Sequence, residues 1–189
     1  VCSRLKEIFV ETVVPSTNPA FGFWLHHFGN KLVDEVQLPE LLNCLPNKEM
    51  IDVREAYMWI LKGCPNPDTV TLRHLGNTCE WYGDWIHNGT ALTLKSYFSG
   101  QTWFLGFVSR QSAQEYGIDY VTFHHKPCFI VRCSETNPSQ TPYTLDMFYP
   151  DHTNSRRIMR SDDRLMCPAL NRAGYPSVSG SNIIELVNA

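Results

Sequence analysis

The chain has 189 residues, of which 43% are hydrophobic and 19% charged, and its formal net charge is -3 at pH 7. This composition excludes long disordered stretches, because so many apolar side chains can bury enough surface to fold. No apolar run approaches the roughly 18 residues that a transmembrane helix needs, so we expect no membrane insertion. The small negative charge argues against a general nucleic-acid-binding surface.

The basic residues differ between the two halves of the chain. Residues 1–98 contain 5 Lys and 3 Arg, whereas residues 99–189 contain 1 Lys and 7 Arg. Arginine is favoured over lysine where a planar group must bind an anion through several hydrogen bonds. The second half is therefore the place to look for an anion site.

The seven cysteines are odd in number and lack paired spacings. That pattern favours a reducing compartment, so we expect a cytoplasmic protein. The competing observation is the tripeptide Asn88-Gly89-Thr90, a glycosylation sequon that matters only in a secreted chain. Because the chain opens with Val1, we expect it to be a fragment of a longer protein.

Residues 1–98 show helical patterns after an initial strand-like run. The β-branched run Ile8 to Val14, closed by Pro15, predicts a strand, and we expect residues 1–30 to be the end of a preceding domain. Further on, apolar side chains recur at i, i+3, i+4 and i+7, which predicts an all-helical module. The predicted helices cover residues 38–45, 53–61, 72–86 and 92–97.

Residues 99–189 have a different pattern, with short apolar runs between capping and turn residues. Their order is strand, helix, strands, helix, which predicts an α+β domain with a central antiparallel sheet flanked by two helices. The domain boundary is therefore expected at residues 98–99, giving domains 1–98 and 99–189. The predicted elements are an apolar run at 103–108, a helix at 109–116, strands at 128–133, 141–149 and 156–159, and a helix at 162–170.

Arg132 is the most informative residue, because it interrupts the apolar run from Cys128 to Cys133. An arginine in a buried strand is costly unless an anion meets it. The alternative is that strand alternation points Arg132 at solvent from an edge strand. Ser134, Glu135 and Thr136 follow it with hydroxyls and backbone N–H groups, a combination that suits a phosphate dianion.

Arg110 is a second candidate, in the first turn of the helix that Ser109 begins. The positive end of the helix dipole adds to its charge, so an anion could bind between Arg110 and Arg132. The alternative is an ordinary exposed helical arginine.

These two arginines lie in motifs that resemble those of Src-homology-2 (SH2) domains. Such domains open with Trp-x-x-Gly-x-hydrophobic-Ser-Arg-x-x-Ala, as in Trp103 to Ala113, and continue to Phe-Leu-Val-Arg-x-Ser, as in Phe129 to Ser134. The resemblance implies that Arg132 is the deep phosphate-binding arginine and that Arg110 lies over the phosphate and ring. It also implies that Ser134, Glu135 and Thr136 form the phosphate-binding loop.

The first half is similar to the linker that precedes the SH2 domain in STAT proteins. The similar segments are Trp81 to Ile86, Leu105 to Ser109 and Ile158 to Leu165, and the resemblance covers about residues 36–176. Departures include Arg110 where STAT proteins usually carry Lys, and a loop at residues 117–126 that is longer than theirs. Cbl ubiquitin ligases, which join an EF-hand-like helical module to an SH2 domain, are the second relative considered.

Several classes of site are not expected. The chain has no calcium-binding loop motif, so an EF-hand-like linker would bind no calcium. The pairs His26-His27 and His124-His125 lack metal-site spacing, and no nucleophile or phosphate-loop motif is present. We therefore predict no catalytic residue, no metal and no cofactor.

Together these features predict a non-catalytic phosphotyrosine-peptide binding module of a STAT-like signalling or transcription-regulating protein. Its expected partner is a tyrosine-phosphorylated peptide or protein, with a homodimer formed through reciprocal phosphotyrosine contacts in the full-length protein. No membrane and no direct nucleic-acid contact are expected, and the STAT resemblance adds the nucleus to the cytoplasm as a location. The alternative is an SH2-like structural or protein-interaction scaffold that no longer reads phosphotyrosine.

Overall fold

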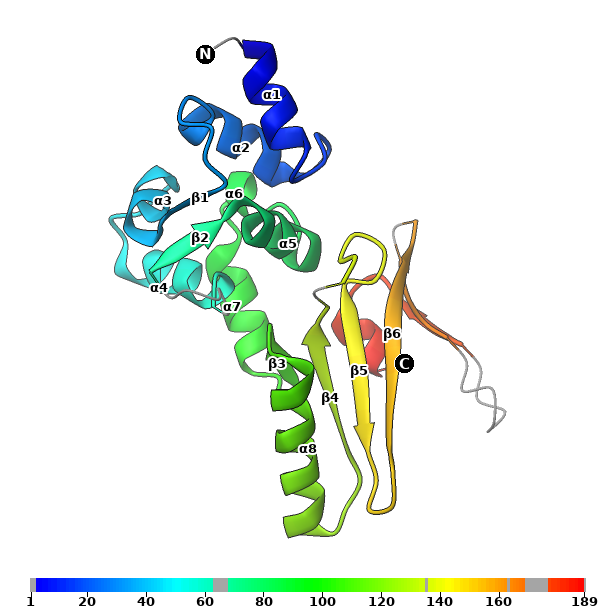
Figure 1. Ribbon diagram of the computed structural model, residues 1–189. Coiled ribbons are helices and arrows are strands. Elements are labelled where there is room, and N and C mark those ends of the chain that lie inside the picture. The colour runs from blue at the N-terminus through cyan, green and yellow to red at the C-terminus, as the bar shows by residue number, and fades with distance from the viewer. Residues whose placement is uncertain (1–2, 63–67, 135, 163, 169–176, 189) are drawn as a thin grey trace. The chain divides into compact units, whose positions relative to one another are not determined.

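The computed structural model describes residues 3–62, 68–134, 136–162, 164–168 and 177–188 (Figure 1). Glu135 and the end of the helix predicted at residues 162–170 therefore lie outside the described residues. The chain divides into two compact units, Val1–Gly100 and Gln101–Ala189. The division falls two residues after the boundary predicted from the sequence.

The first unit is mostly helical but also contains a short two-stranded ribbon. Its strands are β1 (Glu35–Gln37) and β2 (Thr69–Thr71), which pair antiparallel with Val36 opposite Val70. Each strand lies in the loop of a helix–loop–helix, so the ribbon joins the two loops. Its helices are α1 (Ser3–Glu11), α2 (Pro19–Phe28), α3 (Leu38–Cys44), α4 (Ile51–Ile60), α5 (Leu72–Tyr82), α6 (Trp85–Asn88) and α7 (Ala91–Ser99). The all-helical prediction is wrong here, because three-residue strands carry too little alternation to be recognised.

The strand predicted at Ile8 to Val14 is also wrong. Ser3–Glu11 forms α1, and Val10 and Val14, four residues apart, are both buried in the core. The preference of β-branched side chains for strands is weak, and burial of these valines at helical spacing overrides it.

The largest fully buried side chains of the first unit are aromatic, and the polar atoms of Trp24, Tyr57 and Trp85 are hydrogen-bonded. Trp24 Nε1 donates to the Val33 carbonyl at 2.9 Å, and Tyr57 Oη donates to the Pro46 carbonyl at 2.7 Å. Trp85 is fully buried, and its Nε1 donates to Thr78 Oγ1 at 3.2 Å. These rings bury a large apolar area without leaving an unsatisfied donor.

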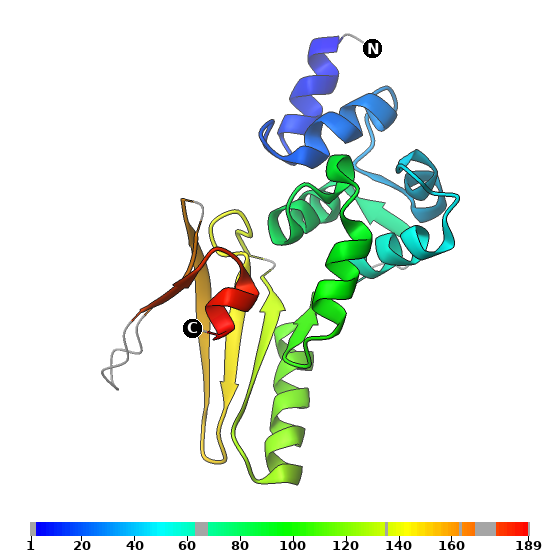
Figure 2. The ribbon, with the colours of Figure 1, turned by 180° about the vertical axis from the view of Figure 1, so that it is seen from behind.

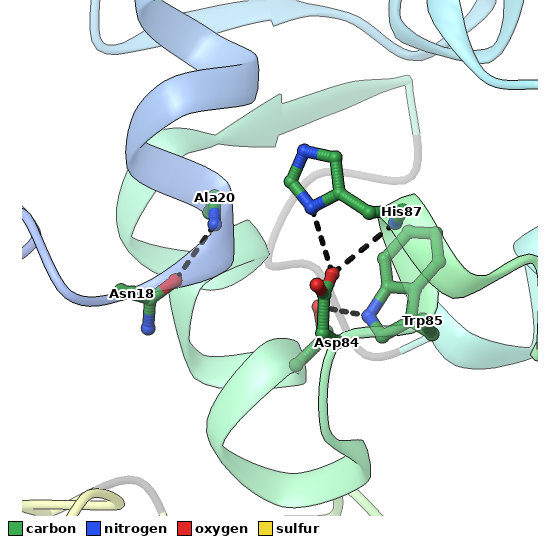
Figure 3. A network of polar contacts seen from close by, with 6 residues as sticks. Asn18, Ala20, Asp84, Trp85 and His87 are labelled. Atoms are coloured by element: carbon green, nitrogen blue, oxygen red, sulfur yellow. Dashed lines mark hydrogen bonds and ion pairs between the residues drawn. The ribbon is translucent and has the colours of Figure 1, made fainter.

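Side chains cap the first turns of α2 and α6, and Figure 3 shows both caps. The Asn18 side chain accepts a hydrogen bond from Ala20 N at 2.9 Å at the start of α2. Asp84 Oδ1 accepts from His87 N at 3.2 Å at the start of α6, and it pairs with His87 Nδ1 at 2.8 Å. Each cap satisfies a backbone N–H that the helix itself leaves unpaired.

The second unit is built on a six-stranded sheet in the order β3-β4-β5-β6-β7-β8. β3 pairs parallel with β4, and the remaining neighbours are antiparallel. The predicted antiparallel sheet thus gains one parallel strand at its edge. The strands are β3 (Phe104–Gly106), β4 (Cys128–Cys133), β5 (Tyr143–Phe148), β6 (Thr153–Ser161), β7 (Arg164–Cys167) and β8 (Val178–Gly180).

Two helices lie on opposite faces of this sheet. α8 (Arg110–His124) packs through Val121 against Ile130 and Phe148, which alternate onto one face. α9 (Ile183–Asn188) covers the other face: it lies behind the sheet in Figure 1 and in front of it in Figure 2. Domains of this mixed type bury one face of the sheet under each helix.

Two elements of this unit differ from the predictions. The residues expected to form a long loop, 117–126, instead continue α8 to His124. At Gly117 a Cβ atom would lie 2.4 Å from the Phe148 ring, so glycine permits the close approach of helix and sheet. The helix predicted at residues 162–170 is wrong where it is described, because Arg164–Cys167 forms β7 beside β6 and β8. None of the described helices is long and apolar enough to cross a bilayer.

β6 changes partners along its length. Residues Thr153 to Ile158 pair with β5, whereas Met159 to Ser161 pair with β7. Among the described residues, Thr153 to Ile158 therefore pair with β5 on one side and have no strand partner on the other side, which is called the outer edge here.

Candidate functional site

A polar cavity of about 360 Å³ lies where the start of α8 meets the sheet. Four of the five predicted phosphate-binding residues line it: Arg110 from α8, Arg132 from β4, and Ser134 and Thr136 from the loop after β4. Glu135, the fifth, is outside the described residues. The cavity also has Thr144, Ser155 and Arg157 in its wall, from β5 and β6.

Arg132 is held inside the sheet by an ion pair. Its Nε donates to Asp146 Oδ2 at 2.8 Å, and the two side chains are 13% and 2% exposed. Asp146 Oδ1 in turn accepts from Ser155 Oγ at 2.5 Å. A half-buried guanidinium without such a partner would be strongly destabilising.

The edge-strand alternative for Arg132 is wrong. β4 lies between β3 and β5, and Arg132 pairs in register with Thr144. Alternation places the side chain on the face that α8 covers, together with Ile130. The arginine therefore interrupts a buried strand and lines a cavity, which is the arrangement expected when an anion is to be bound.

The terminal nitrogens of Arg132 remain available to a ligand. Asp146 occupies only Nε, and within the described parts of the chain no acceptor contacts the two Nη atoms. A guanidinium whose two terminal nitrogens line a cavity can contact two oxygens of one phosphate or carboxylate.

The start of α8 adds positive potential to the cavity. Ser109 is the N-cap, and its hydroxyl accepts from Ser112 N at 3.0 Å. Arg110 follows as the first helical residue and is exposed. Because α8 is 15 residues long, its dipole places partial positive charge beside this arginine.

The loop after β4 closes on itself. Ser134 N donates to the Pro142 carbonyl at 2.8 Å, and Ser134 Oγ donates to the Thr136 carbonyl at 3.1 Å. The same carbonyl accepts from Thr141 Oγ1 at 3.0 Å. The Ser134 hydroxyl must therefore rotate before it can donate to an anion in the cavity.

Sequence reasoning missed Thr144, Asp146, Ser155 and Arg157. Register brings them together, since Arg132, Thr144 and Arg157 lie opposite one another across three strands, as do Ile130, Asp146 and Ser155. One signal was available in the sequence, because Thr144 and Asp146 alternate with apolar residues along β5; the structure shows that both are buried. Buried polar residues at period two indicate a polar site on one face of a sheet.

Arg156 borders the cavity, but strand alternation puts its side chain on the other face of the sheet. Its Nε is buried without a hydrogen-bond partner within the described portion of the structure. Burial raises the pKa of the Cys167 thiol, and the charge of Arg156 opposes that rise. Arg156 is therefore not counted with the arginines that face the cavity.

A metal centre is not indicated by the parts of the chain that the structure describes. They contain no group of three His, Cys, Asp or Glu side chains that could hold a metal ion. The polar groups of the cavity are three guanidinium-bearing side chains and several hydroxyls, which suit an oxyanion.

Comparisons with known proteins include a curated relative of low identity. The chain is 24% identical over 178 residues to "Dual specificity protein kinase shkD" of Dictyostelium discoideum, and the match covers 85% of this chain and 22% of the kinase. The chain thus spans less than a quarter of that relative. No family model matches the chain.

Among solved structures, the chain is similar to "Inactive choanoflagellate E3 ubiquitin ligase Cbl TKB". The identity is 12% and the TM-score 0.48, and the match covers 75% of this chain and 42% of that one. These similarities are too distant to assign the chain to a family. The function is therefore argued from the cavity itself.

Proposed function

We propose that Gln101–Ala189 is a non-catalytic SH2-type module that binds a phosphotyrosine-containing peptide. The observation that carries this proposal is Arg132, half-buried on an interior strand: it lines a polar cavity, and its terminal nitrogens have no acceptor among the described residues. Arg110 at the rim and the hydroxyls of Ser134 and Thr136 supply further donors in the same cavity. Such an array matches a dianion with three oxygens.

Depth supports tyrosine as the phosphorylated residue. The Arg132 side chain is only 13% exposed, so an anion must enter the cavity to reach it. Phosphotyrosine carries its phosphate at the end of a rigid ring, whereas phosphoserine holds it close to the peptide backbone. The longer side chain can therefore contact Arg132 while the backbone stays outside.

The proposals for the first unit, the biological role, the homodimer and the location rest mainly on the sequence motifs. We propose that Val1–Gly100 is an EF-hand-like linker, a reading supported by the ribbon that joins its two helix–loop–helix loops. The STAT-like role in signalling or transcription, the homodimer through reciprocal phosphotyrosine contacts, and a cytoplasmic and nuclear location are proposed on the STAT resemblance alone.

A second function is favoured by the internal hydrogen bonds of the cavity. Asp146 already pairs with Arg132, and Ser134 Oγ already donates to the Thr136 carbonyl. A site in which Arg132 Nε and the Ser134 hydroxyl already have acceptors without a ligand is compatible with an SH2-like interaction scaffold that no longer reads phosphate.

The two functions are separated by binding measurements with paired peptide arrays, one phosphorylated on tyrosine and one not. The phosphotyrosine function predicts binding to the phosphorylated array and a loss of at least 100-fold in Arg132→Ala, because each charge-assisted hydrogen bond contributes about 1.5–3 kcal/mol. Arg164→Ala is the matched control, since Arg164 is exposed on β7 and does not line the cavity. Equal binding to both arrays would favour the scaffold.

A further inference from the structure

Asp146 is the one acidic side chain that contacts Arg132 among the described residues, and its presence beside an anion site requires an explanation. It is 2% exposed and comes from β5, the strand next to Arg132. A carboxylate near a binding site repels an incoming phosphate. Its position is therefore unfavourable for ligand binding unless it performs another task.

The geometry of the ion pair indicates what that task is. Asp146 Oδ2 accepts from Nε of Arg132 at 2.8 Å, and no Nη atom takes part in the ion pair. Because a guanidinium is planar and rigid, a hydrogen bond at Nε fixes the orientation of the whole group. The two terminal nitrogens are then left without an acceptor among the described residues, on a side chain that lines the cavity.

Asp146 is itself held in place from the third strand. Its other oxygen, Oδ1, accepts from Ser155 Oγ at 2.5 Å, and Ser155 lies opposite Asp146 in the β5–β6 register. The carboxylate thus uses one oxygen for β6 and the other for Arg132. These two side-chain hydrogen bonds, from residues on three neighbouring strands, leave the arginine little freedom to turn away from the cavity.

We propose that Asp146, supported by Ser155, is a positioning residue that presents the terminal nitrogens of Arg132 to the bound anion. This role rests on the phosphotyrosine function proposed above. Holding Arg132 in one orientation before binding reduces the entropy that the ligand must overcome. It also keeps the cation paired while the cavity is empty.

A purely electrostatic role and a positioning role predict opposite results. If the Asp146 charge acts only at long range, Asp146→Asn removes a repulsion and phosphotyrosine binds more tightly. If Asp146 positions Arg132, the same change weakens binding, because Arg132 loses its ionised acceptor. Asp151→Asn is the matched control: it removes the same charge from an exposed carboxylate in the same unit, 83% exposed.

The experiment is a titration of each protein with one phosphotyrosine peptide taken from the array, together with NMR detection of the Arg132 Nε–H without ligand. We expect Asp146→Asn to bind at least tenfold more weakly, Asp151→Asn to bind within twofold of wild type or slightly more tightly, and the Nε–H of wild type to exchange slowly with water. Equal or tighter binding by Asp146→Asn, or rapid exchange of the wild-type Nε–H, would overturn the positioning role.

Ser155→Ala keeps the test decisive if Asp146→Asn does not fold. It leaves the ion pair in place but removes the support at Oδ1, so we expect a threefold to fivefold loss of affinity and faster Nε–H exchange. Unchanged affinity in a folded Ser155→Ala protein would contradict the support from β6. Absence of peptide binding by wild type would instead overturn the phosphotyrosine function, so the two failures are distinguishable.

Discussion

The two units use buried polar groups in different ways. In Val1–Gly100 the buried polar side chains are Asn18, His74 and Thr78. Asn18 caps α2, Thr78 accepts a hydrogen bond from Trp85, and His74 lies in α5. In Gln101–Ala189 the buried polar side chains Ser134, Thr144 and Asp146 all lie around Arg132. Polar burial that is scattered supports a fold, whereas polar burial that converges on one cation indicates a binding site.

The largest effect is expected from Trp85→Ala in the first unit. The ring is fully buried beside Tyr57, with ring centroids 5.7 Å apart, so its removal leaves a large cavity. We expect a loss of about 3–5 kcal/mol in the free energy of unfolding. Hydrogen exchange followed by mass spectrometry should show the loss in peptides from residues 1–100.

Trp85→Phe is the control for this variant. It retains most of the ring but loses the donor to Thr78, so it should cost less than Trp85→Ala. Equal protection in wild type and Trp85→Ala would contradict the view that this unit depends on its aromatic core.

The second effect is a dependence of stability on pH that arises from His74. Burial lowers the pKa of His74 to about 4, against about 6.5 for an exposed histidine. Between these values the unfolded chain binds a proton that the folded unit excludes, so stability is constant above about pH 6.5 and falls as the pH drops toward 4. We expect the His74 contribution to fall by about 2 kcal/mol between pH 7 and pH 5.

The measurement is urea unfolding at pH 7 and pH 5 for wild type and His74→Gln. Because glutamine does not titrate, the variant should lack this part of the pH dependence. The same slope in both proteins would rule out His74 as its source.

The last comparison makes the same Gly→Ala substitution in each of the two units. Gly117→Ala places a Cβ atom 2.4 Å from the Phe148 ring, and the resulting overpacking costs about 1–3 kcal/mol. Gly22→Ala in α2 meets no atom within 4 Å, so the higher helix propensity of alanine should stabilise it by about 1 kcal/mol. Thermal unfolding of the two variants should shift Tm in opposite directions, and a shift in the same direction would contradict the tight contact of α8 with β5.

The parts of the site that sequence predicted are those close together along the chain. Arg132, Ser134 and Thr136 lie within five residues, and Arg110 follows directly after a capping serine. A local motif of this kind needs no knowledge of strand pairing. That is why four of the five predicted residues are found in one cavity.

The parts that sequence did not predict depend on strand register. Asp146 and Ser155 reach Arg132 only because β5 and β6 pair at particular positions. Register is set by packing and turns across the whole sheet, so it is hard to obtain from a single chain. The error at Ile8 to Val14 has a related cause, because burial in the core outweighed the local preference of the valines.

The partner change of β6 has a consequence for self-association. The outer edge of Thr153 to Ile158 has no strand partner among the described residues, and an open edge of this length can pair with the same edge of another molecule. Arg156 and Arg157 lie in the middle of that edge. Antiparallel pairing of two copies in the register that sets these arginines opposite one another would bring like charges together, and charged side chains on an open edge disfavour such edge-to-edge pairing.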